Sequence, residues 1–298
     1  MKKASFNSKL LTYMLASTLL ICSCKDQNTF ESGAKNLPRT VSQQFQDYWF
    51  SGEAEITSYK LEQPRYGEMR QGTAVLIFVT ENFLPDLHVK AKNSNSENIP
   101  VLKLNTTKNF TTGIYPYSIM TSSFFPLSTK SHAVKVVTTT QEWCGQLFTQ
   151  LNNRGEFYVE SHSYFEGEAD QNFTVPKTIL EDEIWELIRV SPDELPTGNR
   201  KVIPALDYLK LHHKELKPYE AVCTKENTRY RIEFTELKRT LTINFEAQFP
   251  YQITGWTDQF LSGDKLMTAT ATRLKTLKTP YWKQNAEKFS FLRDSLRL

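Results

Sequence analysis

Glycine and cysteine are both scarce in this sequence, and the motifs that depend on them are missing. Only 11 of 298 residues are glycine and 4 are cysteine. The sequence contains no GxxxxGKS/T phosphate loop, no paired CxxC, no HExxH and no GxSxG nucleophile turn. These absences argue against a nucleotide cradle, a structural zinc site and the common hydrolase motifs, so no metal and no cofactor are expected.

The chain also lacks a net charge once its first residues are set aside. The formal charge is +3, from 36 basic and 33 acidic residues. Lys2, Lys3 and Lys9 account for the whole excess, because the first 24 residues contain no acid. The remainder is balanced, so nucleic acid is not an expected partner.

The longest apolar stretch lies at the N-terminus and is short. Residues 10–22 form an apolar run of 13 residues, whereas a membrane-spanning helix needs about 20. With the preceding lysines, this run predicts a signal peptide over residues 1–23. The sequence Ile21-Cys22-Ser23-Cys24 resembles the bacterial lipobox. The resemblance implies cleavage after Ser23 and attachment of palmitate-type acyl chains to the Cys24 thiol.

The lipobox resemblance also predicts how the protein is attached and organised. Two or three acyl chains give stable anchoring, so we expect a membrane-anchored protein of the cell envelope. The outer membrane is the expected location, with the periplasmic or surface face left open. The alternative is an ordinary cleaved signal peptide that leaves Cys24 as a free thiol. Residues 24–40 are polar and aperiodic and predict a flexible tether, and residues 41–298 predict one β-rich globular domain.

Period-two patterns dominate the predicted domain. Strands are expected over residues 53–61, 73–80 and 133–140, and a hairpin over 145–151 and 156–165 around an Asn-Asn-Arg-Gly turn. Residues 177–190 predict an amphipathic helix with acids in its first turns. Residues 205–219 fit either a helix or an extended segment, and residues 282–298 predict a short helix. The expected fold class is therefore α+β, mainly β, with a curved, mostly antiparallel sheet.

Two architectures satisfy this order of elements. The preferred one is a single sheet wrapped into a half-barrel around an aromatic core, with one or two helices, resembling periplasmic lipoprotein carriers. The alternative is a two-sheet β-sandwich. Tyr115-Pro116-Tyr117, Phe124-Phe125-Pro126 and Phe249-Pro250-Tyr251 place large rings beside proline. Such rings either fill the core at strand ends or line a groove.

Several segments together resemble an uncharacterised family of Bacteroidota-type outer-membrane lipoproteins. The resemblance implies location and fold, and no activity. Some relatives carry the label septum formation inhibitor Maf, a cytoplasmic nucleotide pyrophosphatase, but the export signal and the missing N-terminal Ser/Arg-rich loop give that function no support here. The segments are WFSGEAEITSYKL (49–61), YGEMRQGTAVLIFVTENF (66–83), KLNTTKNFTTGIYPYSIM (103–120), QEWCGQLFTQLNNRGEFYVESHSYFEGEAD (141–170) and IPALDYLKL (203–211).

Cys144 and Cys223 are the cysteines of the predicted domain. An oxidising envelope permits a disulfide between them, which would close a long loop and add a few kcal/mol. The alternative is two buried free thiols in strand-like contexts. Both interpretations stay open, because sequence alone does not place two Cα atoms within bonding distance.

The histidines and their acidic neighbours supply the remaining candidate chemistry. His162, Glu166, Glu168 and Asp170 form the most metal-like cluster, but residues 162, 165 and 166 do not share one face of a strand. A solvated hairpin end is the preferred interpretation. Brought together with His213, two of these residues (His162 and Glu166) would form the site of an envelope hydrolase. The histidines are His88, His132, His162, His212 and His213.

Two functions are consistent with these observations. The first is a non-catalytic binding or structural role at the envelope, directed at a hydrophobic ligand or an envelope partner. The second is a hydrolase whose site is assembled from distant His and carboxylate residues. A structure separates them: an apolar concavity favours binding, and a polar cleft with converging His and carboxylates favours catalysis.

Overall fold

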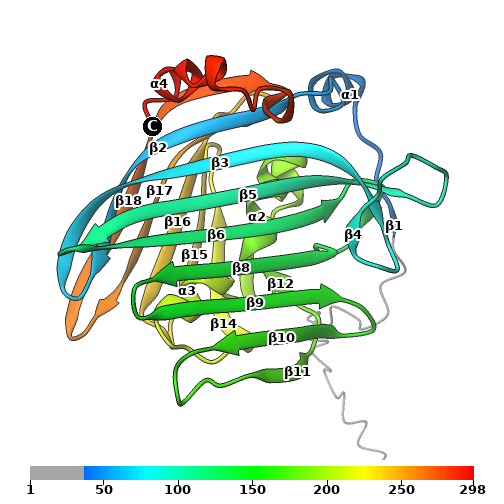
Figure 1. The fold of residues 1–298 in the computed structure, drawn as a ribbon. Coiled ribbons are helices and arrows are strands. Elements are labelled where there is room, and N and C mark those ends of the chain that lie inside the picture. The colour runs from blue at the N-terminus through cyan, green and yellow to red at the C-terminus, as the bar shows by residue number, and fades with distance from the viewer. Residues whose placement is uncertain (1–36) are drawn as a thin grey trace, which may run out of the picture. The chain divides into compact units, whose positions relative to one another are not determined.

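The computed structural model describes residues 37–298. The predicted signal peptide, the cleavage site and Cys24 lie outside this part, as does most of the predicted tether. Nearly all of the strands belong to one sheet (Figure 1). The strands are β1 (Leu37–Pro38), β2 (Ala54–Arg65), β3 (Glu68–Leu84), β4 (Val89–Lys90), β5 (Ile99–Thr112), β6 (Tyr115–Pro126), β7 (Thr129–Lys130), β8 (Lys135–Glu142), β9 (Gly145–Asn153), β10 (Phe157–Ser163), β11 (Gln171–Val175), β12 (Ile179–Leu180), β13 (Gly198–Ile203), β14 (Tyr219–Lys225), β15 (Arg229–Phe234), β16 (Arg239–Phe245), β17 (Ile253–Ser262) and β18 (Lys265–Thr279).

The sheet is built from two meanders that meet in its middle. One runs from β2 through β3, β5, β6, β8, β9 and β10 to the edge strand β11, and the other returns from the edge strand β12 through β13 to β18, which pairs with β2. Only the β12–β13 pair is parallel. Residues 176–178 alone connect the two edge strands. Since each residue adds at most about 3.8 Å, the edges lie within about 15 Å of each other, so the sheet curls far around its interior.

The side-chain alternation of the strands explains this curvature. In β8, Val136, Thr138 and Thr140 are buried, and the residues between them are partly exposed. The same alternation in β16 buries Leu241 and Ile243. The apolar face of each strand must be covered. The sheet covers these faces by curling so that they point into its concave interior.

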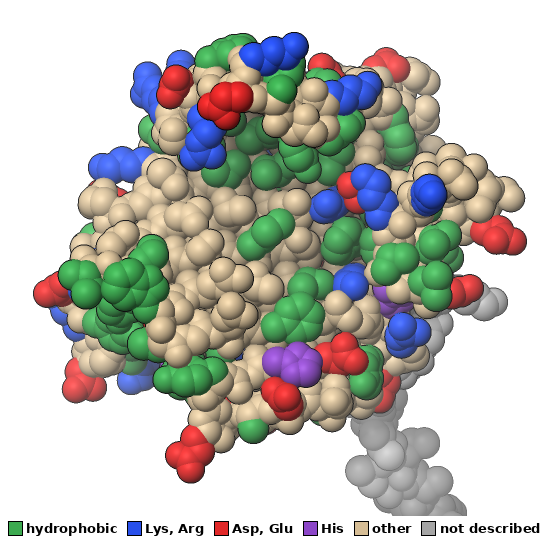
Figure 2. All heavy atoms as spheres, in the orientation of Figure 1, with side chains coloured by type: hydrophobic (Ala, Val, Ile, Leu, Met, Phe, Trp, Pro, Cys, Tyr) green, Lys and Arg blue, Asp and Glu red, His purple; other side chains and the backbone are tan. Residues whose placement is uncertain are grey.

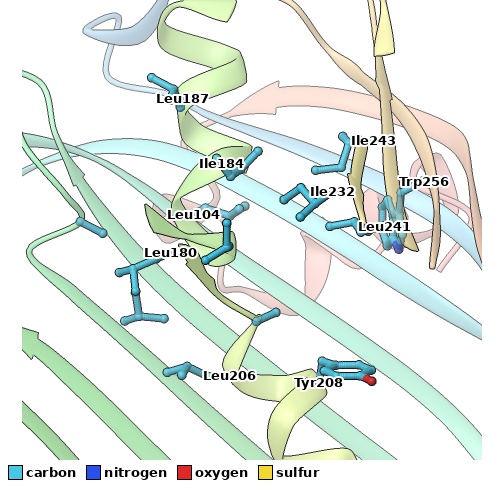
Figure 3. Packing of buried hydrophobic residues seen from close by; sticks show 14 of the residues in the cluster. Leu104, Leu180, Ile184, Leu187, Leu206, Tyr208, Ile232, Leu241, Ile243 and Trp256 are labelled. Carbon is cyan, nitrogen blue, oxygen red and sulfur yellow. The ribbon is translucent and has the colours of Figure 1, made fainter. Parts of the chain in front are cut away.

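Helices fill the concave side of the sheet. α2 (Glu181–Val190) and α3 (Leu206–Leu211) lie inside the curve, whereas α1 (Gln43–Trp49) and α4 (Phe291–Ser295) lie at its top in Figure 1. Short 3-10 turns occur at Pro192–Glu194, Tyr281–Lys283 and Glu287–Phe289. In Figure 3, Ile184 of α2 points toward the strands that carry Ile243 and Trp256, and Leu104 of β5 belongs to the same buried cluster. The core therefore has three layers: sheet, helix and sheet again.

The predicted fold class is confirmed: the protein is α+β, mainly β, with a curved and unclosed sheet. The sandwich alternative is wrong, because one sheet provides both walls of the core. The helix expected over 177–190 begins only at Glu181, since residues 179–180 pair with β13. Residues 206–211 are helical, whereas residues 282–298 form short turns and the five-residue α4. The structure has four α-helices among residues 37–298 rather than the expected one or two.

In the described part of the chain, none of the helices has both the length and the apolar character that a membrane span requires.

Candidate functional site

The α2 helix carries an unusual number of buried charged side chains. Glu181, Asp182, Glu183, Glu186 and Arg189 are all less than a tenth exposed. A helix surrounded by sheet on both sides has no solvent face, so its charges need partners on the strands that enclose it. Those partners define the interior site.

Arg239 of β16 holds the first turn of α2. It donates two hydrogen bonds to Glu181, at 2.6 and 2.7 Å, and two to Asp258 of β17, at 2.8 and 2.9 Å. Burial opposes the charged form, but Asp258 and Glu181 hold the pKa of Arg239 well above its usual value. The ring of Tyr208 lies 3.9 Å below the guanidinium. This network joins α2, α3 and two strands.

Glu183 links the same turn to the loop before β8. Its Oε1 lies 2.7 Å from His132 Nδ1, and its Oε2 accepts a 2.7 Å hydrogen bond from the Ala133 amide. Glu183 Oε1 also accepts from the Leu180 amide at 3.2 Å, which caps the helix. Burial lowers the pKa of His132, but the Glu183 carboxylate outweighs that effect and raises it overall.

A cavity lies beside this network, between α2, α3 and strands β5, β6, β16 and β17. It contains about 520 Å³ of space, including the part that opens to solvent. Lys108 donates a 2.5 Å bond to Asp207 there, and this pairing lowers the pKa of Asp207 despite its burial. Trp185 and Trp256 meet edge to face on one wall, with ring centroids 5.2 Å apart. The cavity is therefore walled by ion pairs and indoles, a poor lining for an acyl chain.

Two carboxyl groups near the cavity have no ionic partner. Asp182 accepts a 3.0 Å hydrogen bond from the Leu206 amide, and burial together with Asp207 raises its pKa well above the usual value. Glu186 is fully buried, and neither carboxylate oxygen has a hydrogen-bond partner among residues 37–298. Burial raises the pKa of Glu186 well above its usual value. Burial therefore disfavours the charged form of both carboxyl groups.

A second feature lies where the hairpins turn at one end of the sheet. The turns β2–β3, β5–β6 and β8–β9 and the loop after β10 share this end, because consecutive strands run antiparallel. Figure 2 shows hydrophobic side chains gathered at the left edge of the molecule, where hairpins end in Figure 1. Four large apolar or aromatic residues in these turns and in the loop after β10 are more than half exposed: Ile114 at 81%, Trp143 at 68%, Tyr164 at 60% and Tyr66 at 59%. Together with Tyr115 they are called the hairpin-end surface.

Direct contacts make this surface continuous. Tyr66 and Tyr117 share a 2.9 Å hydrogen bond between hydroxyls, and the ring centroid of Tyr115 lies 5.9 Å from that of Tyr117 and 6.3 Å from that of Trp143. Tyr164 packs on Gly145, where an added Cβ would lie 2.7 Å from its ring. The glycine therefore sets the position of that ring.

A shallow groove opens beneath the hairpin-end surface, with about 290 Å³ of space when the part open to solvent is included. Tyr117, Thr140 and Phe165 lie in its wall, with Arg65, Glu142, Lys210 and His213 as its charged or titratable groups. The Thr140 hydroxyl is buried and has no hydrogen-bond partner among the described residues. Glu168 binds Lys210 at 3.3 Å and His213 at 2.5 Å beside the groove. Burial tends to raise the pKa of Glu168, but these two partners lower it overall.

The two cysteines are not brought together. Cys144 is exposed at the β8–β9 turn and Cys223 is buried in β14, and both are free thiols. The structure therefore shows no disulfide between these two residues.

The histidines and acids of the hydrolase hypothesis are only partly brought together. His213 pairs with Glu168 rather than Glu166, and His162 lies 3.2 Å from Asp170 at an exposed hairpin end. Glu166 is exposed in a turn. Of the others, His212 is partly buried and packs against the rings of Tyr208 and Phe260, and desolvation lowers its pKa to about 3. His88 is buried and contacts Asn152 at 3.0 Å. No group of three or more His, Cys, Asp or Glu within residues 37–298 is arranged to hold a metal ion.

Comparison with known proteins adds little to this geometry. No protein-family model matches the chain, and no curated protein matches it. Among solved structures, the chain is weakly similar to a porin-like protein from Bacteroides uniformis, at 10% identity over 80% of this chain and 99% of that one, with a TM-score of 0.22. A TM-score this low supports no statement about fold or function.

Proposed function

We propose that the protein is a lipid-anchored envelope protein with a non-catalytic binding role, exerted through the hairpin-end surface. The anchor rests on the lipobox-like sequence that ends at Cys24. The binding role rests on one observation: Trp143, Ile114, Tyr66 and Tyr164 are all more than half exposed at the turns and loop of one end of the sheet. Large exposed apolar surfaces of this kind are uncommon on monomeric proteins unless they bind something.

The position of the surface supports this proposal. β1 pairs with β7, which follows the far end of β6, whereas Tyr115 begins β6 at the hairpin end. The 12 residues of β6 span about 36 Å. A protein attached through Cys24, 13 residues before Leu37, is held from the β1 end. The hairpin-end surface is then separated from the β1 end by the length of β6, which leaves it free to meet another envelope component.

The concave side of the sheet offers less to a hydrophobic ligand. It is occupied by α2 and α3, and its cavity is lined by Lys108, Asp207, Arg239 and Asp258. The proposal therefore assigns binding to the hairpin end and treats the interior charges as ties that hold the helices in place.

Photo-cross-linking in cells tests the proposed role. p-Benzoylphenylalanine replaces Ile114, and as a matched control it replaces Leu87, which is 66% exposed at the opposite end of β3. The proposal expects an adduct of reproducible mass at position 114, about tenfold above position 87, that is lost on Trp143→Ala. Equal adducts at both positions, or adducts that survive Trp143→Ala, would contradict it.

A further inference from the structure

We propose that the groove beneath the hairpin-end surface binds a saccharide chain, with the exposed rings as platforms for sugar rings on either side. This inference rests on the proposed binding role and names the chemistry of its ligand. A sugar ring has a flat C–H face and a rim of hydroxyls that both donate and accept hydrogen bonds. Its binding site therefore needs flat aromatic faces and a mixed set of donors and acceptors close together.

The hairpin end supplies the aromatic faces. The rings of Trp143 and Tyr115 are neighbours, and Tyr164 packs on Gly145. The Tyr66 hydroxyl is hydrogen-bonded to that of Tyr117 in the groove wall. Each ring is held by another residue, so little side-chain freedom is lost when a ligand stacks on it. The rings project from turns that are fixed by the strands below them.

The groove supplies the donors and acceptors. Arg65 and Lys210 donate, Glu142 accepts, and the buried Thr140 hydroxyl has no partner within residues 37–298. Arg65 is fixed by hydrogen bonds to Tyr117 at 3.2 Å and to the Leu211 carbonyl at 2.8 Å. A buried hydroxyl without a partner is costly in a folded protein, and a ligand hydroxyl would satisfy it.

The charge balance argues for an uncharged ligand. Arg65 and Lys210 are offset by Glu142 and by Glu168, which binds Lys210 directly. A phosphate headgroup would require an excess of positive charge, and an acyl chain would require a deeper apolar cavity. A peptide added as a strand would require an unpaired sheet edge, whereas the strands that form this end of the groove are paired on both sides. A saccharide requires none of these three features.

Titration of the full-length protein in detergent with maltohexaose, chitohexaose and xylohexaose tests the inference. Calorimetry and tryptophan fluorescence report binding. We expect at least one of the three to bind, about tenfold more weakly after Trp143→Ala and several-fold more weakly after Thr140→Val, which keeps the side-chain shape but removes the hydroxyl. Leu87→Ala, at the opposite end, should bind within twofold of the wild type.

The outcomes separate this inference from the proposed role. Absence of binding to all three oligosaccharides up to millimolar concentration, or equal binding by Trp143→Ala and Leu87→Ala, overturns the saccharide assignment. Periodate oxidation of the cells' glycans before cross-linking at position 114 gives a second readout. An adduct that is unchanged by periodate and still requires Trp143 overturns the saccharide assignment while leaving the binding role intact. Loss of the adduct after periodate supports both.

Discussion

Arg189 of α2 and Glu55 of β2 form a bidentate ion pair in which each side chain is only 1% exposed. The two hydrogen bonds measure 2.7 and 2.8 Å, and Arg189 Nε also donates to the Pro250 carbonyl at 2.8 Å. Trp49 and Phe78 lie against the guanidinium, and the Tyr48 hydroxyl donates to Glu55. The pair thus ties the C-terminal end of α2 to the middle of the sheet.

Removing Arg189 should destabilise the protein strongly. Arg189→Met leaves the Glu55 carboxylate buried without its cation, a change that costs about 3–5 kcal/mol in comparable sites. Adding Glu55→Gln removes the stranded charge and should recover a large part of the loss. Urea unfolding of the single and double variants measures both values. If the double variant is as unstable as Arg189→Met alone, unpaired charge is not the cause.

The His132–Glu183 pair should make stability depend on pH near neutrality. The pKa of His132 is raised on folding, so the stability it contributes is complete below about pH 6.5 and is lost as pH rises through the raised value. His132→Gln should be less stable than the wild type by roughly 1–2 kcal/mol at pH 6, with the difference shrinking at pH 8.5. Urea midpoints of both proteins across this range test the sign. A difference that grows with pH would contradict the pairing.

Glu186 should lower the stability of the folded protein as the pH rises. Burial raises the pKa of this carboxyl in the folded state, so folding favours its protonated form. The wild type should therefore lose stability relative to Glu186→Gln as pH rises above about 4.5, by up to about 1.4 kcal/mol per pH unit, until the pH passes the raised pKa and the difference levels off. The two proteins should be nearly equal at pH 4. Parallel stability curves would show that a partner compensates the ionised carboxylate.

The free thiols give a direct check of the cysteine assignment. Cys144 is exposed and Cys223 is buried, so a maleimide should label Cys144 in the native protein and Cys223 only after unfolding. Glu142 raises the pKa of the Cys144 thiol, so labelling should be faster in Glu142→Gln. Mass spectrometry of protein taken from the envelope without reductant measures the labels. Protection of both thiols until reduction would restore the disulfide interpretation.

The sequence predicts the sheet well because the signal is local. Alternation over residues 133–140 and the Asn-Asn-Arg-Gly turn at 152–155 depend only on neighbours in the chain, and both predict the observed β8 and the β9–β10 hairpin. The start of α2 is missed because residues 179–180 pair with residues 202–203, a contact that no local pattern records.

The interior ties are less accessible to sequence reasoning. Glu181, Asp182 and Glu183 appear to a pattern search as solvent-facing acids favoured by the helix dipole. Glu181 pairs with Arg239, and Arg189 of the same helix pairs with Glu55. Both partners are distant in the chain and meet α2 only because the sheet curls around it. The hairpin-end surface is easier to recognise in the sequence. Tyr66, Ile114 and Trp143 are large apolar residues at turns, where small polar residues are usual.

Palmitate labelling tests the central claim, that this is a lipid-anchored envelope protein, most directly. The proposed anchor requires a thioether between the diacylglyceryl group and the Cys24 thiol, and serine does not provide that nucleophile. Wild-type protein should incorporate labelled palmitate and partition into detergent, and Cys24→Ser should lose the label and remain as uncleaved precursor. Because its apolar segment of 13 residues is marginal for a membrane span, some of that precursor should appear in the soluble fraction. Labelling that persists in Cys24→Ser, or is absent from the wild type, would contradict the account.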